Sequence, residues 1–162
     1  GVQLNISSKS ELTIAIASII NNVEHYAPDA RLDGILIESM ITNAILELMV
    51  GLRRDPLFGL VLTIASGGVM TEILQDASTV LVPTDNISLQ SAIDSLRIAP
   101  LFDGFRGGQA ASRTAVLDQI KGLVSLMKDT PDIFEIEINP MMVGKDYACC
   151  ADALISVSNA ET

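Results

Sequence analysis

The stretch from residue 134 to residue 140, Phe-Glu-Ile-Glu-Ile-Asn-Pro, alternates strictly between apolar and oxygen-bearing side chains. Because successive side chains of a β-strand point to opposite faces, this pattern predicts a half-buried strand with Glu135, Glu137 and Asn139 on one face. Pro140 has no N–H to donate to a neighbouring strand, so we expect the strand to end there. Residues 147–157 follow a short Gly-Lys-Asp turn and predict the returning strand of a hairpin. We therefore expect the chain to close on an antiparallel hairpin with one polar face.

The polar face of this hairpin has the chemistry of a site for a hard cation. Strand residues rise about 3.3 Å each, so Glu137 and Asn139 would lie roughly 7 Å apart on one side. A carboxylate and an amide oxygen at that spacing can share one magnesium ion that carries a nucleotide, and the hairpin would bring the carboxylate of Asp152 beside them. The alternation equally fits an edge strand whose polar side chains only face water, which is the usual outcome for such a face.

Length and composition fit one domain of moderate size. The chain has 162 residues, of which 49% are hydrophobic, enough to build one core. Its longest apolar runs are strand-sized and too short to span a bilayer, so we expect no membrane contact. The 20 acidic residues against 10 basic ones argue against a nucleic-acid partner, because binding to a phosphate backbone needs clustered Lys and Arg.

The cysteines and the first residue bear on compartment and on completeness. Cys149 and Cys150 are neighbours within a predicted strand, so their side chains point to opposite faces and do not bridge. Unbridged thiols and the lack of a visible secretory signal predict a cytoplasmic protein. The start at Gly1 leads us to expect that the chain is a piece of a longer protein.

Hydrophobic periodicity predicts an α+β fold. A capping box, Ser8 to Glu11, opens a helix that we expect to end near Pro28, and residues 102–108 form a glycine-rich link that we expect to be flexible. Two further helices are expected at residues 87–96 and 114–128. Before the closing hairpin, strands are expected at residues 1–6, 35–40, 45–52, 60–65, 70–74 and 78–82. Strands that follow one another so closely favour a mainly antiparallel sheet with the helices on one face.

A second candidate site lies on the strand expected at residues 45–52. Alternation places Glu47 and Arg53 on one face, and Glu47 stands among apolar neighbours, where a carboxylate needs a partner or a ligand. Arg53 would lie about 20 Å further along, which is comparable to the length of a stretched nucleoside triphosphate. The alternative is a structural carboxylate and a surface arginine paired with Asp55. Gly67 and Gly68 would let the backbone approach a phosphate, or they simply form a bulge or a turn.

Four segments together resemble a known family. Residues 47–59 (Glu-Leu-Met-Val-Gly-Leu-Arg-Arg-Asp-Pro-Leu-Phe-Gly), 67–72 (Gly-Gly-Val-Met-Thr-Glu), 135–140 (Glu-Ile-Glu-Ile-Asn-Pro) and 152–153 (Asp-Ala) are, in order and spacing, similar to the ATP-grasp part of nucleoside-diphosphate-forming acyl-CoA synthetases. Succinyl-CoA synthetase β chains look like more distant relatives. The resemblance covers nearly the whole chain, and it implies a single carboxyl-terminal ATP-grasp lobe over residues 1–162.

The resemblance implies a site for magnesium with ATP or ADP. Asn139 and Asp152 would be metal ligands, with Glu137 a further ligand or a carboxylate behind them, and Arg53 would contact the transferred phosphate as the catalytic residue.

Other positions that match the family would hold the nucleotide itself. Glu47 would lie near the ribose or the metal, and Gly67 and Gly68 would lie near phosphate. The matching border of the adenine pocket consists of three consecutive residues, Glu38, Ser39 and Met40.

The implied reaction interconverts acyl-CoA, phosphate and ADP with the free acid, CoA and ATP, through a phosphohistidine held elsewhere. The partners would be an amino-terminal ATP-grasp lobe and CoA-binding and ligase domains of the same enzyme, together with CoA or acyl-CoA, in a homo- or hetero-oligomer. The chain alone should be inactive. The alternative is a degenerate copy that serves as a scaffold or acyl-CoA sensor, as in fused protein lysine acetyltransferases. It is motivated by Glu38, Ala65 and Ser66, which differ from the residues usual in the family.

Overall fold

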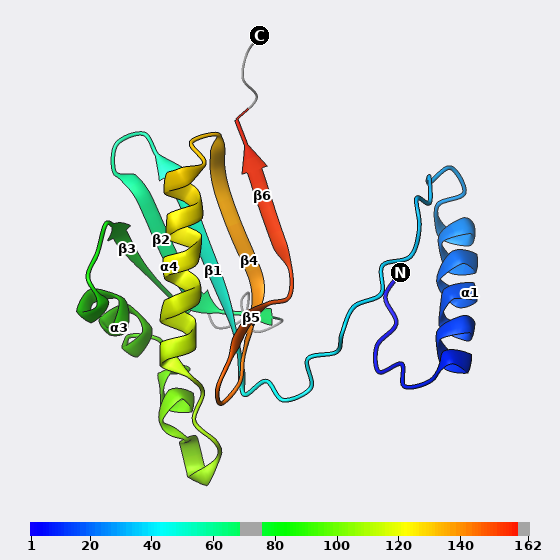
Figure 1. Ribbon diagram of the computed structural model, residues 1–162, viewed down its shortest axis with the longest axis horizontal. Helices are drawn as coiled ribbons and strands as arrows, with labels where there is room; N and C mark the ends of the chain where they lie inside the picture. Colours follow the sequence, from blue (N-terminus) through cyan, green and yellow to red (C-terminus); the bar gives the residue numbers. More distant parts are fainter. Residues whose placement is uncertain (69–75, 159–162) are drawn as a thin grey trace. The chain divides into compact units, whose positions relative to one another are not determined.

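The computed structural model describes residues 1–68 and 76–158, which belong to two compact units, Gly1–Thr42 and Asn43–Thr162 (Figure 1). The first unit contains one helix, α1, over Lys9–Tyr26. Its N-cap is Ser8, whose hydroxyl accepts the Glu11 N–H at 3.2 Å, so the predicted capping box is confirmed at this bond. None of the described helices is both long and apolar enough to cross a membrane. That the two units act as one lobe stays a prediction.

The carboxylate of Glu11 completes this cap one residue earlier than the capping box predicts. It accepts from the N–H of Ser7 at 2.8 Å and from the Ser7 hydroxyl at 2.9 Å. These bonds, led by the backbone N–H of Ser7, lower the pKa of the Glu11 carboxyl. The start of α1 is therefore fixed by contacts within a few residues of sequence.

The strands expected at residues 1–6 and 35–40 are wrong, because neither stretch pairs with a strand among the described residues. Asn5 has a φ of 59°, a left-handed conformation that interrupts an extended run. The apolar side chains of the two stretches are also uncovered, with Val2 78% and Leu36 81% exposed. Alternation alone does not make a strand, since a strand needs a hydrogen-bonded neighbour.

Among the described residues, the second unit is built on a sheet of six strands. All of its pairings are antiparallel, which confirms the predicted antiparallel character of the sheet. The strand order is β3-β2-β1-β4-β5, and β6 also pairs with β4. The strands are β1 Leu46–Asp55, β2 Gly59–Ser66, β3 Ala77–Val82, β4 Ile133–Val143, β5 Ala148–Cys150 and β6 Ala153–Val157. The strand expected at residues 70–74 lies outside the described residues.

Two helices cover one face of this sheet (Figure 1), which confirms the predicted α+β arrangement. Helix α3 spans Asn86–Asp94, and helix α4 spans Arg113–Asp129. The link between them contains the short 3₁₀ helices η2 (Ala99–Asp103) and η3 (Phe105–Gly107). The flexibility expected of this link stays a prediction.

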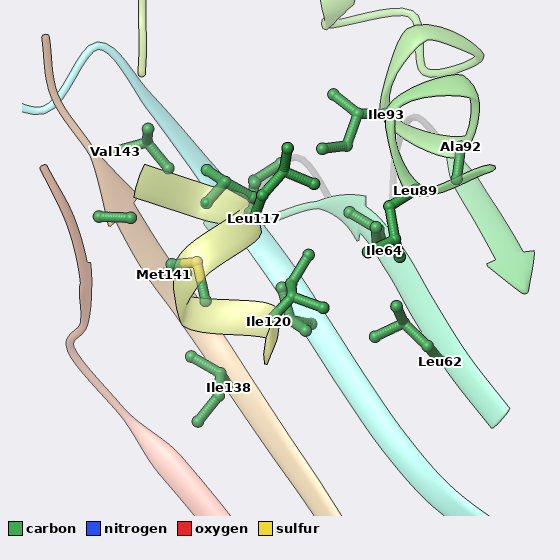
Figure 2. Packing of buried hydrophobic residues seen from close by; sticks show 14 of the residues in the cluster. Leu62, Ile64, Leu89, Ala92, Ile93, Leu117, Ile120, Ile138, Met141 and Val143 are labelled. Carbon is green, nitrogen blue, oxygen red and sulfur yellow. The ribbon is translucent and has the colours of Figure 1, made fainter. Parts of the chain in front are cut away.

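The core lies between this sheet and its helices (Figure 2). The alternation in β1 is confirmed from Leu46 to Arg53, since Leu46, Leu48, Val50 and Leu52 are buried while Glu47 and Arg53 are exposed. Each fully buried aliphatic side chain of this kind contributes about 1.5–3 kcal/mol. The labelled core residues of Figure 2 are Leu62, Ile64, Leu89, Ala92, Ile93, Leu117, Ile120, Ile138, Met141 and Val143.

The prediction that β4 ends at Pro140 is wrong, because the strand continues to Val143. Leu48 of β1 lies opposite Met141 and Val50 lies opposite Ile138, so a β-bulge places two β4 residues, Asn139 and Pro140, against one β1 residue. A bulge leaves its extra residue out of the ladder, which accommodates a proline without an N–H.

A second bulge explains why Phe134 departs from the predicted alternation. Ile133 pairs with Val157 and Glu135 pairs with Ser156, so Phe134 is the extra residue on β4. Ile133 is buried in its place, and Phe134 is 43% exposed. The apolar face expected for residues 134–140 is therefore correct for Ile136 and Ile138 and wrong for Phe134.

Candidate functional site

The sheet face opposite α3 and α4, which we call the open face, carries most of the predicted site residues of the second unit. Gly51 of β1 lies between Thr63 of β2 and Glu137 of β4. Arg53 likewise lies between Val61 and Glu135. Residues directly opposite one another share a face, so the open face is polar along β1 and β4.

At one end of the open face, hydrogen bonds join segments that are far apart in the chain. The N–H of Gly67 donates to the carbonyl of Glu47 at 2.9 Å, and the N–H of Gly68 donates to Oδ1 of Asn139 at 3.2 Å. The N–H of Asn139 donates in turn to the carbonyl of Asp152 at 3.2 Å. We call these five residues the glycine corner. It gathers five of the predicted site residues at one end of the sheet.

Both glycines of this corner are required by their surroundings. A Cβ on Gly67 would lie 2.5 Å from the carbonyl carbon of Leu48, a backbone atom that cannot move aside. Gly68 has a φ of 64°, and a Cβ there would collide with the carboxylate of Glu47. The two glycines let the end of β2 close over β1 at a distance that no other residue allows.

Glu47 is exposed, so the expectation of a carboxylate embedded among apolar neighbours is wrong. Its open-face neighbour Met49 and the small Gly51 leave it uncovered on that side of β1. The carboxylate lies beside Gly68 instead of beneath other side chains. An exposed carboxylate pays no desolvation cost and needs no partner within the protein, so Glu47 is available to solvent or to a ligand.

The closing hairpin is confirmed, but its returning stretch is divided. Strand β5 ends at Cys150 and β6 begins at Ala153, and Asp152 lies in the gap. Its Oδ1 accepts the N–H of Ala153 at 2.8 Å. The side chain is exposed, and its second oxygen accepts no hydrogen bond from the described residues.

Oxygen atoms are the available metal donors in and beside the glycine corner. Glu137 is exposed and precedes Asn139 by two positions on β4, so the row of polar side chains continues from the corner along the open face. Within residues 1–68 and 76–158, no three His, Cys, Asp or Glu side chains gather closely enough to hold a metal ion. A cation here would therefore use few carboxylates, together with the amide of Asn139 and groups of a bound ligand.

Arg53 lies at the far end of β1 from the glycine corner, about 20 Å away by strand rise. Its guanidinium contacts Asp55 at 3.3 Å, which is the pairing that the structural alternative predicts. Asp55 also accepts the N–H groups of Leu57 at 2.9 Å and Phe58 at 3.1 Å. These two bonds, and then the charge of Arg53, lower the pKa of the Asp55 carboxyl.

The adjacent Arg54 has a separate, structural use. Its Nε donates to the carbonyl of Ile133 at 2.8 Å, and its Nη2 donates to the carbonyls of Met127 and, at 3.3 Å, Thr130. These acceptors lie at the end of α4 and the start of β4. Of the Arg53–Arg54 pair, only Arg53 projects onto the open face.

Glu38, Ser39 and Met40 belong to the first unit, Gly1–Thr42. They are exposed and form neither a helix nor a strand. Their predicted place beside adenine stays a prediction.

Sequence reasoning missed Asp76, a carboxylate that is only 7% exposed. It accepts the Ser66 hydroxyl at 2.9 Å and the N–H of Arg97 at 2.9 and 2.8 Å to its two oxygens. No periodic pattern or motif marks this position, because its partners are a hydroxyl and backbone groups. Only its tertiary surroundings reveal it.

Sequence reasoning also missed a hollow of about 870 Å³ on the helical side of the sheet. Arg113 lines it and bonds Asp94 at 3.0 Å and Asp103 at 3.3 Å, with its guanidinium 5.0 Å from the ring centre of Phe102. Its Nη1 is buried and has no hydrogen-bond partner among the described residues. The hollow is lined by Gln90, Asp94, Leu96, Arg97, Ala99, Pro100, Asp103, Gly104, Phe105 and Arg113.

Sequence comparison places this geometry among known proteins. Residues 1–157 match the family described as ATP-grasp domain. The chain is 34% identical over 153 residues to the β subunit of an ADP-forming acetate–CoA ligase of Pyrococcus furiosus, an alignment that covers 94% of this chain and 66% of that subunit. It is 36% identical over 159 residues to a trans-feruloyl-CoA synthase of an unknown prokaryotic organism, covering 97% of this chain and 22% of the synthase.

Solved structures give the same result. A Ca. Korarchaeum cryptofilum dinucleotide-forming acetyl-coenzyme A synthetase 1, in complex with coenzyme A and Ca-AMPCP, superposes with a TM-score of 0.88 at 30% identity, over 98% of this chain and 69% of that one. The same synthetase with coenzyme A and Mg-AMPPCP has a TM-score of 0.83 at 27% identity, over 98% of this chain and 68% of that one. The chain thus spans about two thirds of these structures, and it spans less than a quarter of the longer synthase named above.

Proposed function

The chain belongs to the ATP-grasp family, and from that premise we propose that it supplies the magnesium- and nucleotide-binding face of an ADP-forming acid–CoA ligase. The whole protein would interconvert acyl-CoA, phosphate and ADP with the free acid, CoA and ATP. The observation that carries this proposal is the glycine corner, where hydrogen bonds tie Gly68, Asn139 and Asp152 together at one end of an uncovered polar face.

The donor atoms at the glycine corner fit magnesium. Asn139 and Asp152 are the proposed ligands, with Glu137 as a further carboxylate, and all three offer the oxygen donors that magnesium prefers. Magnesium bound to nucleotides usually takes one or two carboxylates and completes its coordination with phosphate and water, so a cluster of three acidic side chains is not needed. Bound there with a nucleotide, it would offset the negative charge of the phosphates.

The two glycines would serve the nucleotide through their lack of side chains. The N–H of Gly67 is used by the carbonyl of Glu47, and the N–H of Gly68 by Asn139. Because neither glycine has a side chain, nothing at these two positions would keep a phosphate from coming close to the backbone. The exposed carboxylate of Glu47 beside this turn is the proposed contact to ribose or to the metal.

Arg53 is the proposed catalytic residue, as a cation for the transferred phosphate. Its side chain is 53% exposed and its pairing with Asp55 is a surface contact, which is weak enough to exchange for a more highly charged phosphate. An arginine beside a phosphoryl group stabilises the negative charge that develops while this group is transferred, and it does so without gaining or losing a proton. Glu38, Ser39 and Met40 are proposed to border the adenine ring.

The proposed partners follow from the relatives. One of them is named as a subunit, and others are several times longer than this chain. We therefore expect an amino-terminal ATP-grasp lobe, CoA-binding and ligase domains, a homo- or hetero-oligomer, and CoA or acyl-CoA as a ligand of the assembly. The unbridged thiols of Cys149 and Cys150 fit a reducing, cytoplasmic location. No observation specifically favours the scaffold or sensor alternative.

Calorimetric titration of Mg-ADP into the complete protein tests the proposal. Asn139→Ala and Asp152→Ala should each weaken binding roughly tenfold or more, which corresponds to about 1.4 kcal/mol, and should abolish ADP-dependent turnover. Asn22→Ala on α1 and Asp118→Ala on α4 are matched controls, because both side chains are exposed and lie outside the corner. Unchanged binding and turnover in both corner variants would reject the assigned roles. CoA binding without any Mg-ADP binding by the unmodified protein would favour a scaffold or sensor.

A further inference from the structure

Ser66 and Asp76 are the two buried polar side chains among the described residues, and they bind each other. Ser66 is the last residue of β2, and Asp76 directly precedes β3. The Ser66 hydroxyl donates to Oδ2 of Asp76 at 2.9 Å, and the Ser66 N–H donates to the Asp76 carbonyl at 3.0 Å. A carboxylate this deeply buried costs free energy unless donors surround it, so its position calls for an explanation.

The remaining donors to Asp76 come from the helical layer. The N–H of Arg97 lies 2.9 Å from Oδ1 and 2.8 Å from Oδ2, and the N–H of Ile98 lies 3.4 Å from Oδ2. Both residues follow closely on Ser95, the C-cap of α3. The carboxylate thus fastens the end of β2 to the chain that leaves α3, and it accepts from donors on both sides of the core.

This attachment sets the place of the glycine corner. Ser66 is bonded directly to Gly67, whose position is confined by the backbone of Leu48. A displacement of Ser66 would reach Gly68 through Gly67 and would change the 3.2 Å bond from Gly68 to the side chain of Asn139. Asp76 itself belongs to no predicted site.

We propose that Asp76 is a positioning residue of the nucleotide site, which holds Ser66 so that the glycine turn keeps the amide of Asn139 in its binding orientation. This inference rests on the proposed function of the glycine corner. It adds that a buried side chain, which the nucleotide does not need to touch, determines how well the corner binds.

The available substitutions separate the charge of Asp76 from its shape. Asp76→Asn keeps Oδ1 as an acceptor for the Arg97 N–H, and its Nδ2 can donate to the Ser66 hydroxyl oxygen. That Nδ2 would also face the N–H groups of Arg97 and Ile98, so only part of the side-chain attachment is kept. Asp76→Ala removes it and leaves backbone N–H groups without an acceptor. Ser66→Ala removes the hydroxyl bond to Oδ2 and leaves in place the backbone bond from the Ser66 N–H to the Asp76 carbonyl and the bonds from Arg97. Asp85→Ala is the matched control, because it removes the N-cap of α3 and weakens the same helix without touching Ser66.

The test measures Mg-ADP affinity by calorimetry and stability by thermal unfolding for these variants of the complete protein. Asp76→Ala should weaken Mg-ADP binding about tenfold, Asp76→Asn should weaken it less than Asp76→Ala does, and Ser66→Ala should weaken it about threefold. In the double variant Ser66→Ala/Asp76→Ala, the loss of Mg-ADP binding free energy should be smaller than the sum of the two single losses, because both substitutions remove the same bond. Asp85→Ala should lower the melting temperature and leave affinity unchanged.

Three results would overturn the positioning role of Asp76, and a fourth would overturn the proposed function on which it rests. Wild-type affinity in folded Asp76→Ala overturns the positioning role, and so does a loss of affinity in Asp85→Ala that matches its loss of stability. If Asp76→Ala does not fold, wild-type affinity in Ser66→Ala is the overturning result. An unmodified protein that binds no Mg-ADP overturns the proposed function, and this inference with it.

Discussion

The two ends of β1 are held in different ways. At the glycine corner, the structure depends on contacts between distant segments, such as the bond from Gly68 to Asn139 across 71 positions of sequence. At the other end, Asp55 bonds the N–H groups of Leu57 and Phe58, two and three positions away. The corner is therefore a product of the whole fold, whereas the turn is largely a local structure. A site built in the first way is sensitive to changes far from it.

Gly67→Ala should have the largest effect on stability, because the added Cβ would collide with the backbone of Leu48. We expect a loss of about 3 kcal/mol in the free energy of unfolding, measured by chemical denaturation. Gly122→Ala is the control, since a Cβ at this position of α4 meets nothing within 4 Å. There we expect a gain of about 1 kcal/mol from helix propensity. A Gly67→Ala protein as stable as the wild type would contradict the close packing of the corner.

Arg54→Lys tests a long-range contact at the end of β1 near Asp55, where the other contacts are local. The Arg54 side chain reaches backbone carbonyls at the end of α4 and the start of β4. A lysine cannot reproduce the fork that reaches several carbonyls at once, so we expect a loss of about 2 kcal/mol. Lys128→Arg on the exposed surface of α4 is a control for the exchange of the two side chains. Wild-type stability in Arg54→Lys would mean that the end of α4 is held by packing alone.

Asp55→Asn should have a smaller effect that depends on pH. The pKa of Asp55 is lowered in the folded protein by the N–H groups of Leu57 and Phe58. Its contribution to stability is thus fully present above the pKa of the unfolded chain and is lost as pH falls through the folded value. Wild type and variant should differ in urea unfolding at neutral pH and converge in acid. A difference that grows in acid would contradict the role of the carboxylate.

Arg53→Ala should have the smallest effect on stability, within about 0.5 kcal/mol, because its contact with Asp55 is exposed. If Arg53 contacts the transferred phosphate as proposed, turnover of the complete protein should fall roughly a hundredfold or more. Unchanged kcat in a folded Arg53→Ala protein would remove its catalytic assignment and leave a surface arginine. Measuring both quantities on one preparation separates the two outcomes.

The sequence predicted elements whose signals are local. The capping box at Ser8, the helix expected at residues 114–128 and the alternation in β1 are all confirmed, because each depends on residues within a few positions of one another. The strands expected at residues 1–6 and 35–40 failed for the complementary reason. A strand exists only where a second segment pairs with it, and alternation carries no information about that segment.

The sequence names candidate residues for the site but does not predict how they are arranged. The identities of Asn139 and Asp152 follow from the motifs, but the bond between Asn139 and Gly68 depends on how β2 closes over β1. Asp76 was missed because its partner Arg97 contributes a backbone N–H, which every non-proline residue has. The roles in metal and nucleotide binding stay predictions.

The bulges in β4 reverse which residue numbers face inward. Ile133 is buried, then Ile136 and Ile138, and then Met141 and Val143, so inward positions change from odd to even and back to odd. Deleting Pro140 would give a regular zigzag in which Met141 and Val143 still face the core, because the bulge absorbs one extra residue. With Pro140 present and no bulge, the same two side chains would turn toward the solvent. An alignment of relatives can therefore open a one-residue gap at either bulge without exchanging inside and outside. A one-residue gap elsewhere in this strand would exchange the two faces downstream, and the parity of the buried positions offers a simple check on any such alignment.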